Sequence, residues 1–275
     1  MEDDDGAHSG HPGRLLIIGG AEDRCHGAQL LERFVELCGG SAARIALVTT
    51  ATGQPDQVHA GYERVFRRLG ASQTVQLRLR GRSDADSDEA AKVLQDATGV
   101  FISGGDQSRL RTLVGSRSND ILRDRLHGDG LVIAGTSAGA TAMGRTMILG
   151  GEGPDVSAAA VRTGPGLGLI TKMLIDMHFG ERGRLPRLLR AVALDPDHLG
   201  VGIDENTGIL VEGNSFEVLG RGVVTVADAE HATVVHAAGD DPITLFGVRL
   251  HLLPLGCIFN TGTREATIGP AHDRY

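Results

Sequence analysis

The chain has 275 residues and a mass of 28.8 kDa, with a formal net charge of −8 and a pI near 5.7. Hydrophobic residues make up 41% and charged residues 23%, a balance typical of globular proteins that excludes a mostly disordered chain. The acidic net charge argues against non-specific electrostatic binding to nucleic acid or to an anionic membrane surface. We therefore expect neither nucleic acid nor a membrane among its partners.

We expect neither a targeting segment nor a disulfide framework from the apolar runs and the cysteines of this sequence. No apolar run approaches the roughly 20 residues that cross a bilayer, and the acidic start at Met1 is unlike the basic opening of a signal peptide. We expect a cytoplasmic protein. Cys25, Cys38 and Cys257 are widely spaced and form no CxxC pair, so reduced, structural thiols are a better interpretation than disulfides or zinc.

The first half of the chain alternates between apolar runs and helical patterns. Residues 1–13 are acidic and small, so we expect a flexible tail before one domain over residues 14–275. The segments expected as strands are 15–18, 45–48, 75–79, 100–102 and 131–134. The segments expected as helices are 29–37, 55–69, 87–96, a stretch after Asp106 and another after Ser137. Buried strands each followed by a helix predict an α/β fold with a mostly parallel sheet flanked by helices.

The second half becomes rich in loops and short strands. One clear helix is expected over residues 185–194. Short β-like runs separated by Gly, Asn and Asp are expected as strands over 201–203, 208–211, 216–219, 223–226, 233–235 and 248–253. We expect these additional C-terminal strands to complete a single mixed sheet.

Three Gly-rich segments follow expected strands, where parallel sheets bind their ligands. They are Gly19–Asp23, Gly104–Gln107 and Gly135–Gly139. The first two raise a nucleotide-binding protein as an alternative, but neither is a G-x-G-x-x-G or a P-loop with its lysine.

The third segment contains a candidate nucleophile. Gly135-Thr-Ser-Ala-Gly139 fits G-x-S-x-G between an apolar strand and a helical stretch, which is the context that a nucleophilic serine needs. The glycines permit close backbone approach, and a helix N-terminus directs N–H groups toward a developing oxyanion. Ser137 would then attack a carbonyl, whereas the alternative is a helix N-cap in a tight turn. A glutamine amidotransferase would need cysteine at this position.

A serine nucleophile needs a base and a group that orients the base. His178 ends the apolar run that begins at Met173, so a strand would deliver it to a crevice, although a lone histidine is more often structural. Asp204 and Glu205 follow another apolar run and are the candidate acids. The order Ser, His, acid differs from the Ser, acid, His order of ordinary α/β-hydrolases.

Taken together, these segments resemble the cyanophycinases, relatives of dipeptidase E among the serine peptidases. The resemblance covers the chain from Gly13 to about Gly213. It rests on the segments 18–23, 103–107, 135–139, 164–168, 178–187 and 202–205. It implies a fold similar to the class I glutamine amidotransferases and flavodoxin, and it suggests a homodimer.

The resemblance also implies a reaction. Ser137 would be the nucleophile, His178 the general base and Glu205 the group that orients His178, with the backbone N–H groups of Gly105 and Ala138 as the oxyanion hole. Members of the family hydrolyse cyanophycin, a poly-aspartate with arginine on each side chain, to β-aspartyl-arginine dipeptides. No metal or organic cofactor is implied, and the sequence has no ligand cluster that suggests one.

Each cyanophycin unit offers one carboxylate and one guanidinium, and guanidinium groups bind carboxylates through paired hydrogen bonds. The residues expected to hold the substrate carboxylates are Arg182, Arg184 and Arg187, although a solvated basic helix face is the alternative. Gln107 and Asp176 are expected as polar anchors near the scissile unit. The acids expected to meet substrate arginine are Asp106, Glu22 and Asp23.

One position departs from the family pattern. Family members usually carry glutamine before the histidine, and this chain has Met177, a flexible apolar side chain, in its place. We hypothesise that the protein binds cyanophycin with a rearranged pocket. Cleavage of another arginine-bearing peptide or amide, and a non-catalytic module that binds an arginine-rich ligand, are the alternatives.

Overall fold

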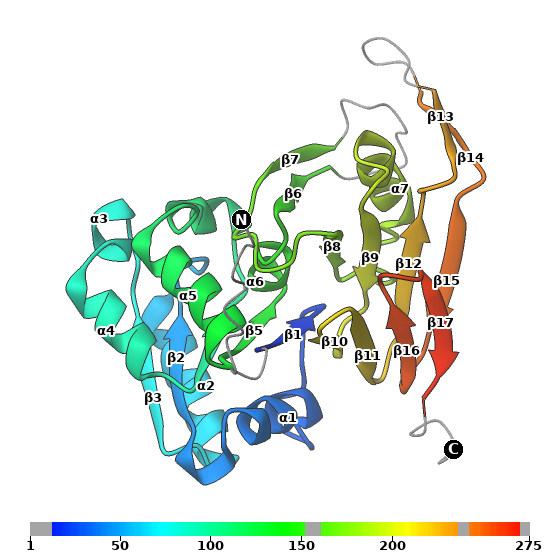
Figure 1. The fold of residues 1–275 in the computed structure, drawn as a ribbon. Helices are drawn as coiled ribbons and strands as arrows, with labels where there is room; N and C mark the ends of the chain where they lie inside the picture. The colour runs from blue at the N-terminus through cyan, green and yellow to red at the C-terminus, as the bar shows by residue number, and fades with distance from the viewer. Residues whose placement is uncertain (1–12, 152–160, 236–241, 270–275) are drawn as a thin grey trace, which may run out of the picture.

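The computed structural model describes residues 13–151, 161–235 and 242–269, and Figure 1 shows how their helices and strands are arranged. The predicted acidic tail lies outside the described residues except for Gly13. Within these ranges a nine-stranded sheet forms the centre, and a separate four-stranded sheet lies beside it.

The nine-stranded sheet has the order β17-β16-β11-β10-β1-β5-β4-β2-β3. Its parallel part is β1 (Arg14–Ile18), β2 (Arg44–Val48), β3 (Gln73–Leu77), β4 (Gly99–Ile102) and β5 (Val132–Thr136). Its antiparallel extension is β10 (Thr207–Glu212), β11 (Ser215–Gly220), β16 (Cys257–Asn260) and β17 (Glu265–Ile268). The predicted α/β fold, with a mostly parallel core and additional C-terminal strands, is confirmed.

Helices cover both faces of the parallel part, because its strands are apolar on both sides. Leu16 and Ile18 of β1 pack in one cluster with α1 (Gln29–Leu37) and α2 (Pro55–Arg68). Leu15 and Ile17 pack in another cluster with α4 (Asp88–Asp96) and α5 (Arg117–Gly128). Shorter helical turns are η1 (Gly40–Ala42), α3 (Arg82–Ala85), η2 (Gln107–Thr112) and α6 (Ala138–Thr141). None of the helices in the described ranges is long and apolar enough to cross a membrane.

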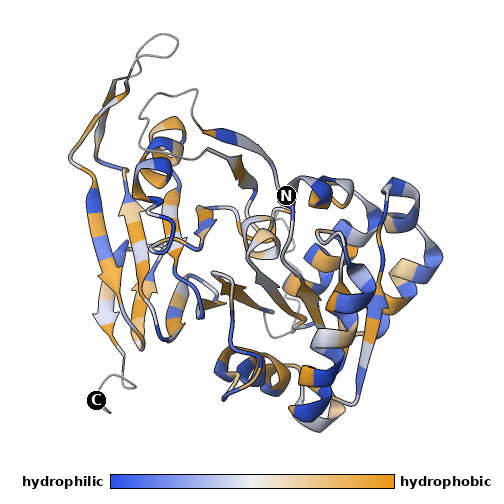
Figure 2. Cartoon of the chain, turned by 180° about the vertical axis from the view of Figure 1, so that it is seen from behind, coloured by the Kyte–Doolittle hydropathy of each residue, from blue (hydrophilic) through white to orange (hydrophobic). Residues whose placement is uncertain are grey.

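The second sheet has the order β15-β12-β9-β8 and carries the loop that follows β8. Its strands are β8 (Met173–Met177), β9 (Leu199–Ile203), β12 (Val224–Asp228) and β15 (Arg249–Leu253). On β9, Gly200 and Gly202 leave space for Leu188 of α7 (Leu185–Leu194) and for Phe179. Figure 2 shows apolar residues concentrated in the strands of both sheets.

The prediction of one mixed sheet is therefore wrong in one respect, because the later strands divide between two sheets. After β9 the chain turns at residues 204–206, and β10 pairs with β1 instead of continuing the β9 sheet. Hydrophobic periodicity marks a strand but does not specify its partner. Two strand pairs complete the described chain, β6 (Thr146–Gly150) with β7 (Arg162–Pro165) and β13 (Thr233–Val235) with β14 (Thr244–Phe246).

Candidate active site

Ser137 lies at the sharp turn between β5 and α6. Its backbone has φ 51° and ψ −113°, an unfavourable conformation for a residue with a side chain. Its N–H donates a hydrogen bond of 3.0 Å to the carbonyl oxygen of Ile18, which fixes the turn to the end of β1. The strand, strained serine and helix reproduce the local geometry of a nucleophile elbow.

His178 follows β8 directly and contacts Ser137. The imidazole Nε2 lies 2.9 Å from Ser137 Oγ, and Nδ1 lies 2.6 Å from Glu205 Oε1. The histidine side chain is only 12% exposed. A hydroxyl, an imidazole and a carboxylate from three separate segments therefore form one continuous line of hydrogen bonds.

Asp204 and Glu205, the two candidates for the acid that orients His178, have different partners. Asp204 accepts hydrogen bonds from the backbone N–H groups of Gly180 at 2.8 Å and Val223 at 3.0 Å. Asp204 therefore holds two loops together, and the carboxylate beside the imidazole belongs to Glu205.

The Gly19–Gly20 pair lies under the imidazole. A Cβ atom at Gly20 would lie 2.3 Å from His178 Cε1, and the φ of Gly20 is +107°. Both the close contact and the positive φ therefore exclude any residue with a side chain here. The carbonyl oxygen of Gly19 accepts a 2.8 Å hydrogen bond from the N–H of His178. Close packing against His178 therefore accounts for Gly19 and Gly20, and no bound nucleotide is needed to explain them.

Gly105 and Ala138, the residues expected to form the oxyanion hole, lie on two segments that meet at the serine. A Cβ atom at neighbouring Gly104 would lie 3.2 Å from Ser137 Cβ, which places the end of β4 beside the nucleophile. Gly105 has φ +144°, and its own Cβ would lie 2.2 Å from the carbonyl oxygen of Ala51. Neither N–H has a hydrogen-bond acceptor in the part of the chain that the structure describes. Both are available to stabilise negative charge.

Glu22 lies beneath the nucleophile turn rather than in contact with solvent. It is 5% exposed, and its carboxylate accepts hydrogen bonds from Thr136 Oγ1 at 2.5 Å, Tyr62 Oη at 2.5 Å and Arg24 Nη2 at 2.9 Å. Burial, followed by the neighbouring Glu22 carboxylate, raises the pKa of Tyr62 well above its usual value. Tyr62 had no sequence signal beyond its place on an amphipathic helix.

The two acids expected to meet a substrate guanidinium in the Gly19–Asp23 segment have local partners instead. The carboxylate of Asp23 accepts the N–H groups of Cys25 and His26, and these two bonds are the main reason that the pKa of Asp23 is lowered. The structure therefore gives Glu22 and Asp23 roles in shaping the loop after β1.

Asp176 and Arg187 form a buried ion pair. Asp176 is fully buried and Arg187 is 4% exposed. Arg187 Nε donates to Asp176 Oδ2 at 2.8 Å, and Nη2 donates to Oδ1. A paired, charge-assisted contact of this kind is strong when both groups are desolvated. The pair joins β8 to α7.

The other two predicted arginines lie in different environments. Arg184 is buried, donates to the carbonyl oxygen of Met177 and lies 2.9 Å from the Met177 sulfur. Met177 is itself buried, so its thioether packs beside the guanidinium. Arg182 is exposed, its backbone N–H donates to the carbonyl oxygen of His178 at 3.2 Å, and its guanidinium has no hydrogen-bond or ionic partner among the described residues.

Gln107 and Asp106 follow the candidate oxyanion turn. Gln107 Nε2 donates to the carbonyl oxygens of Ile148 at 3.2 Å and Leu149 at 3.1 Å. Asp106 is exposed, and hydrogen bonds from Ser108 lower the pKa of its carboxyl group. The structure thus places Gln107 between the oxyanion turn and β6.

Metal-ligating residues do not gather in the described residues, where no group of three or more His, Cys, Asp or Glu side chains could hold an ion. All three cysteines are free thiols, and Cys38 and Cys257 are buried. Burial raises the pKa of both buried thiols.

Comparison with known families identifies the class of protein. The model of peptidase family S51 matches residues 15–219, which include Ser137, His178 and Glu205. The chain belongs to peptidase family S51. It is accordingly a serine peptidase, and the nucleotide-binding and non-catalytic alternatives are set aside.

Curated relatives give the same result over most of the chain. A cyanophycinase of Trichormus variabilis is 39% identical over 266 residues, spanning 94% of this chain and 89% of the relative. A cyanophycinase of Geminocystis herdmanii is 35% identical over 261 residues, spanning 93% and 96%. The resemblance to the cyanophycinases is therefore confirmed.

A solved structure supports the fold. A peptidase from an acI-B1 actinobacterium matches with a TM-score of 0.68 and 21% identity, covering 90% of this chain and 97% of that one.

Proposed function

We propose that this peptidase hydrolyses cyanophycin from a chain end to β-aspartyl-arginine dipeptides, with Ser137, His178 and Glu205 as its catalytic triad. The observation that carries the proposal is the line of contacts from Ser137 Oγ through the His178 imidazole to Glu205. The names of the curated relatives support the choice of substrate.

The reaction begins when Ser137 Oγ attacks the scissile carbonyl carbon while His178 Nε2 accepts the hydroxyl proton. Glu205 receives a hydrogen bond from Nδ1–H and stabilises the imidazolium that forms. His178 then gives the proton to the leaving amine, and the acyl chain remains on Ser137. Water, deprotonated by the same imidazole, hydrolyses the ester and restores the serine.

The oxyanion of each tetrahedral intermediate lies against the N–H groups of Gly105 and Ala138. Both groups have fixed positions in the fold, because Gly105 packs on the backbone of Ala51 and Ala138 begins α6. Such fixed donors contribute about 3 to 4 kcal/mol each to transition-state stabilisation in serine peptidases.

We assign substrate contact to the predicted polar groups according to their exposure. Arg182 is the exposed guanidinium that meets a substrate carboxylate, and Arg184 supports it from the buried side. Gln107 and Asp106 contact the scissile unit from the oxyanion turn. Asp176 and Arg187 bind one another, so we do not assign them direct contact with the substrate. Their role is to hold β8 against α7 beside the substrate.

Met177 favours one second candidate, hydrolysis of a smaller arginine-bearing amide. Its thioether takes a place where family members usually carry an amide, so the pocket has one polar contact fewer.

We also expect a homodimer that acts in the cytoplasm, and light scattering of the purified protein gives its mass in solution.

The test of this proposal is incubation of the purified protein with cyanophycin and, in parallel, with small arginine amides, with products identified by mass spectrometry. The proposal predicts β-aspartyl-arginine from the polymer. An intact polymer alongside a cleaved small amide would replace it by the second candidate. The Met177→Gln variant, run beside the wild type, shows whether the amide restores polymer cleavage in that case.

A further inference from the structure

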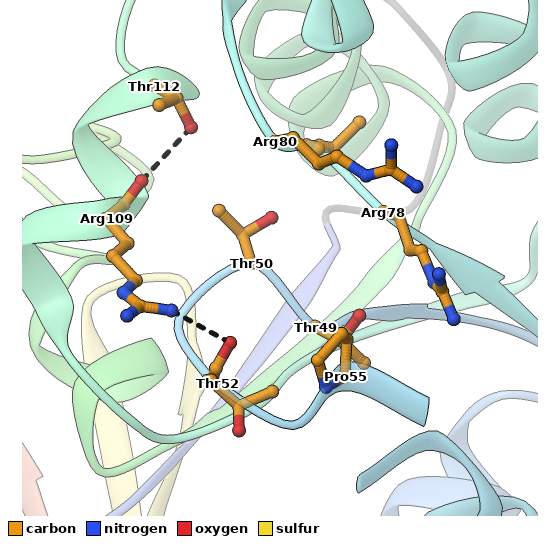
Figure 3. A pocket seen from close by; sticks show the side chains of 10 residues that line it. Thr49, Thr50, Thr52, Pro55, Arg78, Arg80, Arg109 and Thr112 are labelled. Carbon is orange, nitrogen blue, oxygen red and sulfur yellow. Dashed lines mark hydrogen bonds between the residues drawn. The ribbon is translucent and has the colours of Figure 1, made fainter. Parts of the chain in front are cut away.

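A cationic hollow lies along the same sheet edge as the triad, and no step of the proposed reaction uses it. Its volume is about 460 Å³, within the range of ligand pockets. It is formed by the segments that follow β2 and β3 and by η2, which lies on the other side of the hollow from Arg78 and Arg80 (Figure 3). Its lining includes Thr50, Thr52, Pro55, Arg78, Arg80 and Arg109.

The charge of the hollow is positive. Three arginines line it, and no acidic residue does. Arg78 has an ion pair with Asp56 outside the lining, and Arg109 lies 4.0 Å from Asp106. Within the described residues the guanidinium of Arg80 has no hydrogen-bond or ionic partner. At least one exposed cation is therefore available to an anionic ligand.

A hydroxyl group and the start of a helix lie beside these guanidinium groups. Figure 3 shows Thr50 between Arg109 on one side and Arg78 and Arg80 on the other. Thr50 Oγ1 is buried and makes no hydrogen bond with any described residue. Pro55 begins α2 beside the hollow, so the positive end of that helix dipole lies there too. These features suit a carboxylate.

The position of the hollow relates it to the substrate. The strand order is β5, β4, β2, β3, so the hollow between β2 and β3 lies two to three strand spacings from the Ser137 end of β5. At about 4.8 Å per spacing this separation is roughly 10 to 14 Å. An extended peptide advances about 3.5 Å per residue, so about three or four residues span it.

The hollow is also connected to the oxyanion turn. Ala51, between Thr50 and Thr52, accepts a 2.9 Å hydrogen bond from the N–H of Asp106. Arg109 Nη1 donates to the carbonyl oxygen of Thr52 at 3.1 Å. A substrate lying along this edge can therefore reach the hollow and the oxyanion turn together.

We propose that this hollow is a remote subsite that binds a carboxylate of the substrate chain three or four residues from the scissile bond. The proposal rests on the proposed function, because a poly-aspartate with arginine on each unit supplies a carboxylate at every residue. The exposed guanidinium of Arg80 binds it, and the charges of Arg78 and Arg109 beside it add to the attraction. The subsite makes the enzyme prefer long chains.

The test compares kcat/KM for a two-unit cyanophycin oligomer and for an oligomer of about six units, because only the longer one spans both sites. The variants are Arg80→Gln, Arg80→Lys and, as a control with the same charge change, Arg123→Gln. Arg123 is exposed on α5 and does not line the hollow.

We expect Arg80→Gln to lower the ratio of kcat/KM for the long to the short oligomer about fivefold, the upper range for one exposed ion pair. The loss should lie mainly in KM, Arg80→Lys should recover part of it, and Arg123→Gln should keep the wild-type ratio. Added salt should lower the wild-type ratio, since it screens exposed charges.

An unchanged ratio in Arg80→Gln would overturn the remote subsite and leave the proposed function intact. Wild-type protein that cleaves neither oligomer would overturn the proposed function and this inference with it.

Discussion

Thr136 and Glu22 are joined by a 2.5 Å hydrogen bond from the threonine hydroxyl to the glutamate carboxylate. Thr136 immediately precedes Ser137, so this bond connects the nucleophile turn to the loop after β1. The other acceptor sites of Glu22 bind Tyr62 of α2 and Arg24. Glu22 is therefore a positioning residue that joins three segments below the serine.

The Glu22→Gln substitution tests this role. It removes the charge that three donors share, so we expect the free energy of unfolding to fall by about 1 to 3 kcal/mol. A shift of the serine would also lower kcat roughly tenfold to a hundredfold with little change in KM. Urea denaturation and steady-state kinetics measure the two effects. Glu89→Gln, at an exposed glutamate of α4, is the matched control, and an unchanged kcat in Glu22→Gln would contradict the positioning role.

Glu205→Gln tests the third member of the proposed triad. Glutamine keeps the size of the side chain but removes the charge that stabilises the imidazolium, so we expect kcat to fall about 10²-fold to 10⁴-fold. Glu181 accepts the backbone N–H of Glu205 at 3.1 Å and is a close control. Glu181→Gln should stay within a fewfold of the wild type, and equal losses in both variants would argue against a specific role for Glu205.

The Asp176–Arg187 pair should dominate the stability of the second sheet. Asp176→Leu removes a carboxylate that two buried guanidinium groups share, those of Arg187 and Arg184, so we expect a loss of about 3 to 5 kcal/mol in the free energy of unfolding. The double variant Asp176→Leu/Arg187→Met removes the Arg187 charge as well and should recover part of that loss, because Arg184, 3.6 Å from Asp176 in the wild type, keeps its charge without this carboxylate. A single variant as stable as the wild type would show that the pair contributes little.

His251 should make stability depend on pH. Burial, and then repulsion from Arg249, lowers the pKa of His251 below its usual 6.5, although Asp228 opposes the shift. The unfolded chain then binds the proton more tightly than the folded chain does. The neutral form is therefore the one that stabilises the fold, and stability is lost as pH falls from about 6.5 toward the lowered pKa of the folded chain.

Urea denaturation at about pH 7.5 and pH 5.5 measures this effect. His251 packs edge-on against Phe259 with ring centroids 5.2 Å apart, so His251→Phe keeps an aromatic side chain there. We expect a smaller difference in unfolding free energy between the two pH values in His251→Phe than in the wild type. The same difference in both proteins would assign the pH dependence to other groups.

The parallel half of the fold is predictable from sequence because its strands are buried on both faces and read as continuous apolar runs. The helices over 29–37 and 185–194 have the predicted bounds, since their apolar faces are regular. β3 begins at Gln73 instead of residue 75, because it is an edge strand with polar residues at its start.

Several later strands carry no such signal. β17 is exposed along its whole length, and β14 has only three residues, so neither shows a buried pattern. The division of the C-terminal strands between two sheets depends on long-range pairing, which local periodicity does not contain.

Site residues that belong to a local sequence motif were predictable from the sequence. Site residues whose role depends on contacts with side chains far away in the sequence were not. Ser137 and His178 stand out by local context. Glu205 and Asp204 are neighbours with the same charge, and only tertiary structure shows which one contacts the imidazole. Asp176 and Arg187 likewise looked like ligand contacts, because pairing between a strand and the following helix cannot be read from the sequence.

The measurement that tests the account most directly is labelling with a serine-reactive phosphonate probe, followed by peptide mapping and by kinetics of Ser137→Ala. We predict one adduct, on Ser137, that is lost in His178→Ala, together with a fall in kcat of more than about 10³-fold in a stably folded Ser137→Ala protein. Label on another residue, or retained turnover in Ser137→Ala, would contradict Ser137 as the nucleophile.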